Sequence, residues 1–236
     1  MSGPRPVEPM RELVFPDPSS YADLVTLVRR ARTADPDGAV RLHVAGKVLG
    51  VWAAALPGTG LFAEGAAIGV RGIELAEAGA LDVVVPSAAL ADRFARAEGT
   101  PGSGPGSDGD VGAPTRLPVP PAGTHTAWAG ALPAGPWEQL GEVDPTAVLD
   151  AASAGIAEIA AGAGRGPAGA LAVAELRHRV WSRPLTTDAP GATVPAGAGF
   201  AAFALGLVRP TDPPVPVYRC GRWVRLRGVG GHILAR

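Results

Sequence analysis

Four histidines and one cysteine are the residues of this sequence best suited to catalysis or to binding a transition metal. The histidines, His43, His125, His178 and His232, stand far apart, and none lies in the HExxH or HxE spacing that places two ligands on one face of a helix or strand. Cys220 is the sole cysteine, so one chain can form neither an internal disulfide nor a cysteine-based metal cluster. The sequence predicts no metal site and no cofactor.

One glycine-rich segment, GRGPAG at residues 164–169, matches the spacing of a dinucleotide-binding fingerprint. Such a loop binds phosphate only when it follows a strand, so that the next helix begins at the pyrophosphate. Here the preceding residues have helical periodicity, and we interpret the segment as a turn between helices. The sequence also lacks a P-loop, a GxSxG elbow and a clustered acidic motif. These patterns favour a protein that is not an enzyme and has no catalytic residue.

An enzyme remains the competing interpretation, because a site can be assembled from residues that are distant in sequence. Side chains of that kind are His43, Asp82, Arg177 and His178. A lone histidine on a strand or helix is more often a structural group than a catalytic one. The sequence does not decide between the two roles.

The charge pattern of residues 215–236 differs from that of the whole chain. This segment carries five arginines and no acidic residue, whereas the chain has a net charge of −1. We expect strands around Cys220-Gly221 and around Gly228 to Gly231. A two-residue turn at Cys220-Gly221 turns four side chains to one face, Tyr218, Trp223, Arg225 and Arg227. Val217, Val224 and Leu226 then lie on the other face.

Aromatic rings flanked by arginines suit contact with phosphate, stacking on a base, or contact with an acidic protein surface. The candidate partner-binding residues are Tyr218, Arg222, Trp223, Arg225 and Arg227. The plainer interpretation is a solvated strand face on which arginine stems cover Trp223. The leading hypothesis is a non-enzymatic, intracellular binding or scaffold protein that contacts a protein or another acidic macromolecule through this hairpin. A nucleic-acid-associated protein is an alternative that the near-neutral charge opposes, and a homo-oligomer is compatible with both.

Composition predicts a soluble, cytoplasmic protein. Apolar residues make up 47% of the 236 residues and charged residues 18%, so a buried core is expected. The N-terminus lacks the basic start and apolar core of a signal peptide, and the apolar stretch from Pro195 to Val208 is too short to cross a bilayer. A lone cysteine fits a reducing compartment.

Residues 10–98 have the pattern of an antiparallel sheet with two helices. The first helix is expected from Asp17-Pro18 to Arg32, because aspartate caps the helix and proline suits its first position. Short strand-like runs follow at residues 40–45, 48–56, 67–75 and 81–85, and a second helix begins with Ser87 as its N-cap. The step from strand to helix, VVPSAAL at residues 84–90, resembles one subdomain of a DNA sliding clamp. That resemblance implies a fold and only weakly a function.

Residues 99–114 are rich in glycine, proline and serine, and we expect a flexible linker there. Residues 115–236 should then form a mainly helical domain. Helices are expected from Asp144-Pro145 to Gly162, from Pro167 to Trp181 and from Ala196 to Val208, followed by the β-hairpin. Three helices and a hairpin resemble a winged helix, although the third helix has no polar side chains to read bases. The predicted fold class is α+β.

The chain as a whole resembles uncharacterised two-domain families of GC-rich bacteria. Lys47 is the single lysine among 21 basic residues, and glycine and proline are abundant, with 33 and 25 copies. This skew reflects codon composition and carries no chemistry. The resemblance implies no activity.

Overall fold

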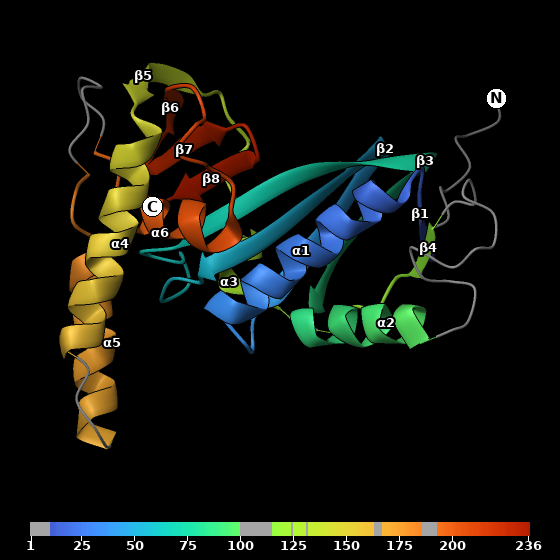
Figure 1. Cartoon of the computed structure of the whole chain (residues 1–236), viewed down its shortest axis with the longest axis horizontal. Helices are drawn as coiled ribbons and strands as arrows, with labels where there is room; N and C mark the ends of the chain where they lie inside the picture. The colour runs from blue at the N-terminus through green and yellow to red at the C-terminus, as the bar shows by residue number, and fades with distance from the viewer. Residues whose placement is uncertain (1–9, 100–114, 124, 131, 163–166, 186–192) are drawn as a thin grey trace. The chain divides into compact units, whose positions relative to one another are not determined.

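The computed structural model describes residues 10–99, 115–123, 125–130, 132–162, 167–185 and 193–236 (Figure 1). Helices and strands occupy similar shares of these residues, and every strand pair with a defined register is antiparallel. The predicted α+β class is confirmed.

The described residues form two compact units. Unit 1 contains those up to residue 53 and from 72 to 125, and unit 2 contains those from 54 to 71 and from 126 to 236. Two long strands, β2 (Ala39–Leu56) and β3 (Ala67–Pro86), contribute residues to both units.

This division differs from the expected domains, residues 10–98 and 115–236, in two places. The loop between β2 and β3 belongs to unit 2, and strand β4 (Thr115–Pro118) belongs to unit 1, where it pairs with β1 (Glu12–Phe15). Composition along the chain does not predict either difference, because each depends on contacts between segments that are distant in sequence. The expected linker, residues 99–114, lies outside the described residues except for Gly99, the last residue of a helix.

Helix α1 (Pro18–Ala34) begins where the sequence predicts. The carboxylate of Asp17 accepts a hydrogen bond from the Ser20 backbone nitrogen at 2.8 Å, and Pro18 occupies the first helical position. The buried face of α1 contacts the core of unit 1 through Tyr21, whose ring meets Phe15 and Phe94 edge-on at centroid distances of 5.6 and 5.9 Å. The local signals of a helix start therefore give the correct boundary.

Strands β2 and β3 are each longer than predicted, because the chain continues as one strand across the expected breaks between residues 45 and 48 and between residues 75 and 81. Gly46 adopts a φ of 63° inside β2 and so changes the strand locally without ending it. Gly79 lies where a Cβ atom would collide with the Met10 side chain. Gly46 allows an irregular backbone inside a strand, and Gly79 allows a neighbouring side chain to lie close to a strand. The presence of glycine in the sequence does not distinguish either case from a turn.

Helix α2 (Ser87–Gly99) follows β3 directly and buries Leu90 and Phe94. The expected N-cap role of Ser87 is wrong. Its hydroxyl oxygen is buried without a hydrogen-bond partner among the described atoms, and its backbone nitrogen donates to the Gly38 carbonyl. Ser87 is therefore tied to the loop before β2 through its backbone.

The larger sheet has the order β2-β3-β8-β7-β6-β5. Its last four strands belong to unit 2 and are β5 (Glu138–Val143), β6 (Val215–Cys220), β7 (Trp223–Gly228) and β8 (Gly231–Ala235). The β6–β7 turn is formed by Gly221 and Arg222, one residue later than predicted. Strand β5 was not predicted, because its sequence, EQLGEV, is polar and short and includes a bulge.

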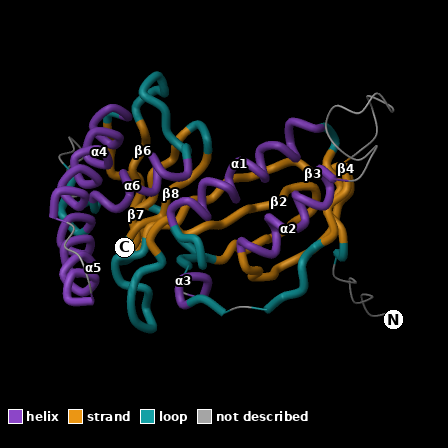
Figure 2. The backbone as a smooth tube through the Cα atoms, turned by 60° about the horizontal axis from the view of Figure 1, so that its bottom comes forward, coloured by secondary structure: helices purple, strands orange, loops and turns teal. Residues whose placement is uncertain are grey.

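Four helices of unit 2 are α3 (Ala127–Gly130), α4 (Pro145–Gly162), α5 (Pro167–Trp181) and α6 (Ala196–Leu205). Helices α4 and α5 lie side by side, and α6 packs against α4 and β8 (Figure 2). Helices α4 and α5 match their predicted bounds closely. Helix α6 ends before its predicted end, because Gly206 adopts the left-handed conformation of a C-cap.

Helix α6 is a core element with one large exposed side chain. Seven of its residues are buried, and a Cβ at Gly199 would lie 2.5 Å from the Val148 carbonyl oxygen of α4. Phe203 is 50% exposed and so does not belong to this buried surface. The winged-helix resemblance is not supported either, because the hairpin belongs to the larger sheet and does not stand alone as a wing.

Candidate functional site

The β6–β7 ladder brings the candidate aromatic and basic residues together. Tyr218 pairs with Arg225, Cys220 pairs with Trp223, and Arg227 pairs across β7–β8 with His232. Paired residues lie on the same face of a sheet, so all of these side chains share one face. Val217, Val224 and Leu226 lie on the opposite face, as predicted, although the turn lies one residue later than expected.

Arg225 lies between two aromatic rings. Its guanidinium carbon is 4.4 Å from the centre of the Tyr218 ring and 4.5 Å from that of Trp137, the residue just before β5. Both distances are within the range of a cation–π interaction. We call Trp137, Tyr218, Arg225, Arg227 and His232 the hairpin platform.

Two polar atoms of the platform are buried without a hydrogen-bond partner among the described residues, Nε of Arg225 and Nδ1 of His232. Burial lowers the pKa of Arg225, and the neighbouring charge of Arg227 acts in the same direction. Burial also lowers the pKa of His232, with further contributions from Arg225 and Arg227. A carboxylate or phosphate placed here would offset both the repulsion and the missing hydrogen bonds.

Two of the five predicted partner-binding residues are not part of the platform. Trp223 is 5% exposed, so it belongs to the core and cannot offer a ring to a ligand. Arg222 lies in the turn, where its Nη1 is 3.7 Å from Oε1 of Glu64. Tyr218 and Arg225 are half-buried on the platform, and Arg227 is exposed beside them.

The local excess of arginine is largely neutralised by acidic residues from other segments. Arg219 forms an ion pair with Glu138 at 3.0 Å, and Arg236 forms one with Glu64 at 2.8 Å. A charge count over residues 215–236 cannot include these partners. Within the part of the chain that the structure describes, Arg225 and Arg227 have no carboxylate partner.

Sequence reasoning missed Trp137 and His232 as neighbours of the hairpin. Trp137 stands in a glycine- and proline-rich connection, and only the pairing of Glu138 with Arg219 brings it to the sheet. The position of His232 could have been predicted from the sequence, because a tight turn between Gly228 and Gly231 places His232 opposite Arg227.

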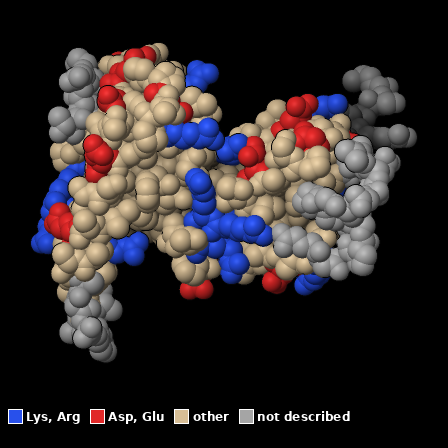
Figure 3. Space-filling view, in the orientation of Figure 1, with Lys and Arg blue, Asp and Glu red and all other residues tan. Residues whose placement is uncertain are grey.

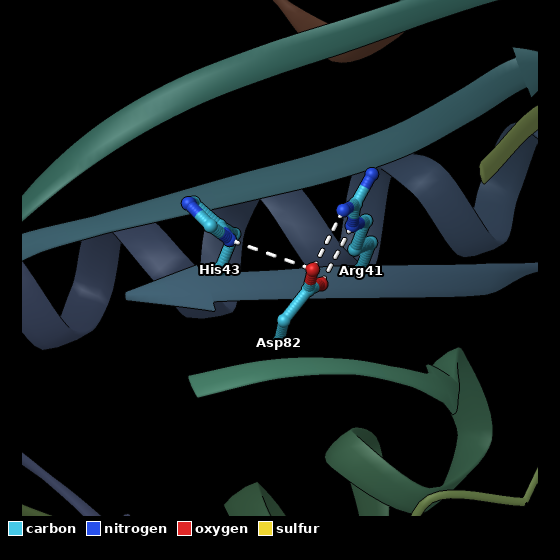
Figure 4. Close-up of polar contacts among 3 residues, drawn as sticks. All are labelled: Arg41, His43 and Asp82. Atoms are coloured by element: carbon cyan, nitrogen blue, oxygen red, sulfur yellow. Dashed lines mark hydrogen bonds and ion pairs between the residues drawn. The ribbon is translucent and has the colours of Figure 1, made fainter. Parts of the chain in front are cut away.

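The residues of the competing enzyme interpretation are divided between the two units, with His43 and Asp82 in unit 1 and Arg177 and His178 in unit 2. Arg41 and His43 of β2 and Asp82 of β3 lie together in unit 1 (Figure 4). Arg41 donates to both carboxylate oxygens of Asp82 at 2.7 Å, while His43 Nδ1 is 3.7 Å from Oδ2. The hydrogen bonds from Arg41 lower the pKa of Asp82, with a smaller contribution from His43. Both carboxylate oxygens of Asp82 therefore accept hydrogen bonds from Arg41. The side chains of Arg41, His43 and Asp82 are all partly exposed.

Arg177 and His178 belong to unit 2, on the exposed side of α5. Lys and Arg atoms lie around the C-terminal end of this helix, while Asp and Glu atoms gather over β5 (Figure 3). Basic residues at a helix C-terminus interact favourably with the helix dipole. Arg183 there also forms a two-point ion pair with Glu158 of α4, at 2.6 and 2.8 Å. This ion pair joins α4 to the segment that follows α5.

No group of three His, Cys, Asp or Glu side chains gathers for metal binding among the residues described. Cys220 is a free, half-buried thiol. None of the described helices is long and apolar enough to cross a membrane.

Two family models match the chain. Residues 8–118 match a domain of unknown function, DUF8010, and residues 132–236 match another, DUF8185. A search of the curated proteins found no match.

Among solved structures, the chain is similar to bacterial DNA polymerase sliding clamps. Two are from Caulobacter crescentus, with TM-scores of 0.47 and 0.48 and identities of 13% and 14%, and they match over 95% and 96% of this chain and 64% and 65% of the clamp. A third, from Pseudomonas aeruginosa, has a TM-score of 0.44 and 13% identity over 95% of this chain and 63% of that one. The chain spans less than two thirds of the length of these clamps.

Proposed function

We propose that this chain is a non-enzymatic binding protein whose hairpin platform contacts a carboxylate-bearing segment of an acidic partner protein. The observation that carries this proposal is the environment of Arg225. Its guanidinium is held between Trp137 and Tyr218, and no carboxylate among the described residues balances its charge. A partner carboxylate would complete an interaction that the chain has already oriented.

The composition of the platform favours a protein partner. Tryptophan, tyrosine and arginine are the residues most enriched at the energetic centres of protein interfaces. Because the two rings already fix Arg225, little side-chain entropy would be lost when it meets a partner. Arg227 is exposed beside it and supplies a second donor to the same ligand.

A nucleic-acid partner is the second candidate. It is favoured by three exposed arginines near the C-terminal end of α1, Arg29, Arg30 and Arg32. Affinity for nucleic acid depends on many phosphate contacts, each neutralised by a cation. The platform offers two arginines without a carboxylate partner among the described residues, so its own chemistry fits a short acidic protein segment better.

A titration of the ¹⁵N-labelled protein with model ligands tests the proposal. The probes are a short peptide of alternating Glu and Gly, the corresponding Lys and Gly peptide, and an oligothymidylate. We expect the acidic peptide to shift the Trp137 indole and Arg225 Nε resonances, and the basic peptide to shift neither.

The variant Arg225→Gln should abolish the response, while Arg219→Gln, on the same hairpin, should preserve it. Arg219 is the matched control because it is exposed and already paired with Glu138. Stronger binding of the oligothymidylate, with the same dependence on Arg225, would favour the nucleic-acid candidate. No response of Trp137 or Arg225 to either anion would contradict both.

A further inference from the structure

Unit 2 contains a pocket that the platform does not use. Its volume is about 290 Å³, near the lower end for small-molecule sites. The walls come from the loop after β2, the C-terminal end of α5, the start of α6 and the strands β7 and β8. Val224 and Ala235 of its wall pair with each other, and strand alternation turns them away from the face that carries Arg225.

The charged part of the pocket has an excess of positive charge. Oε1 of Glu64 is 2.8 Å from Nη2 of Arg236 and 3.7 Å from Nη1 of Arg222. Two guanidinium groups therefore share one carboxylate. The Arg222 side chain is 79% exposed and only loosely held, which leaves its donors free to meet a ligand. His178 also lines the pocket and contributes a ring nitrogen that can form a hydrogen bond with a ligand.

Two residues of the pocket wall carry buried N–H donors that have no acceptor among the described atoms. They are Nε1 of Trp181 and Nε of Arg236. Buried donors without an acceptor are uncommon in folded proteins, and each is destabilising. Ser182, one residue after α5, adds an exposed hydroxyl to the same wall. The set of groups is rich in donors and suits a ligand that supplies acceptor oxygens.

Apart from Thr193, the rest of the lining is apolar and includes the side chains of Trp181, Pro195 and Val224. We infer that this pocket binds a small organic anion, a carboxylate or phosphate monoester attached to a compact apolar body. The anionic group meets Arg222 and the donors of α5, and the apolar body contacts Trp181 and Val224. This inference is independent of the function proposed for the platform, because it depends on different side chains.

The test uses phenylacetate and phenyl phosphate as probes, with benzyl alcohol and benzylamine as the neutral and cationic counterparts. Binding is followed through the indole resonances of the five tryptophans in the full-length ¹⁵N-labelled protein. We expect one or both anions to shift the Trp181 resonance, with no comparable shift for Trp137. The neutral and cationic probes should bind at least about tenfold more weakly, since each lacks the charge-assisted hydrogen bonds.

Two pairs of variants provide the controls. Arg222→Gln should weaken binding of the anion about tenfold, whereas Arg219→Gln should not change it. Ser182→Tyr should fill the pocket and abolish binding, whereas Ser153→Tyr, at an exposed position of α4, should leave it intact. Equal binding of benzyl alcohol, a response at Trp137 in place of Trp181, or equal effects of the two arginine variants would overturn the inference.

Discussion

The guanidinium of Arg225 lies 4.4 Å from the centre of the Tyr218 ring, and Tyr218 is the residue directly opposite Arg225 in the β6–β7 ladder. The register of the hairpin therefore creates this contact, and Trp137 covers the guanidinium from the neighbouring strand segment. A change at any of the three residues alters the environment of the other two.

A double-mutant cycle of Tyr218→Leu and Arg225→Met should reveal coupling between the two side chains. We expect an interaction energy of about 0.5–1 kcal/mol in the free energy of unfolding, as for a partly exposed cation–π pair. Urea unfolding of the wild type, both single variants and the double variant measures it. Additive effects within error would show that the contact contributes nothing to stability.

His232 should make stability depend on pH. Burial, with the charges of Arg225 and Arg227, lowers the pKa of His232 in the folded protein, so the unfolded chain takes up a proton at higher pH than the folded chain. Stability should therefore fall as the pH decreases below the unfolded-state value of about 6.5. His232→Gln should flatten the curve of unfolding free energy against pH in this range. An unchanged slope would show that His232 titrates alike in both states.

The ion pair of Asp82 with Arg41 should contribute little at neutral pH and less in acid. Arg41 lowers the pKa of Asp82, so the contribution is present above the unfolded-state value of about 4 and is lost as the pH falls through the folded-state value. Because Asp82 is half-exposed, we expect Asp82→Asn to cost less than about 1 kcal/mol. The free energy of unfolding of the wild type and of Asp82→Asn, measured at pH values above and below the pKa of Asp82, gives this cost. A larger loss in acid than at neutral pH would contradict this assignment.

Two residues of α6 should respond very differently to a negative charge. Phe203→Asp places the carboxylate at a half-exposed position and should cost no more than about 1–2 kcal/mol. Leu205→Asp buries an unpaired charge and should destabilise by several kcal/mol, since Leu205 is 2% exposed. Thermal melts of both variants, with circular dichroism to confirm folding, compare them. Similar losses would mean that Phe203 is covered by a second surface in solution.

The parts of the fold that the sequence predicts well are those that depend on adjacent residues. Asp144 accepts a hydrogen bond from the Thr146 backbone nitrogen at 2.6 Å and caps α4, as Asp17 caps α1. In each case the capping residue, the proline and the first turn are neighbours in the chain. The same holds for the two faces of the hairpin, which follow from alternation along one strand.

The parts that escape prediction depend on segments brought together by folding. Glu138 and Glu64, which neutralise Arg219 and Arg236, are more than seventy residues away from them in sequence. Trp137 reaches Arg225 only through the pairing of β5 with β6. Of the candidate site, the sequence therefore predicts the strand that holds the arginines but not which of those arginines remain without a carboxylate.

The most direct test of the proposed function is site-specific photo-crosslinking from the platform in the native cell. Gln139 is exposed and pairs with Tyr218, so a photoreactive residue there samples what contacts the platform, and one at Ser153 serves as the control. We predict one acidic protein crosslinked from position 139, absent from position 153, lost with Arg225→Gln and retained with Arg219→Gln. A crosslink that is unchanged by Arg225→Gln, or no crosslinked protein from position 139, would contradict the proposed function.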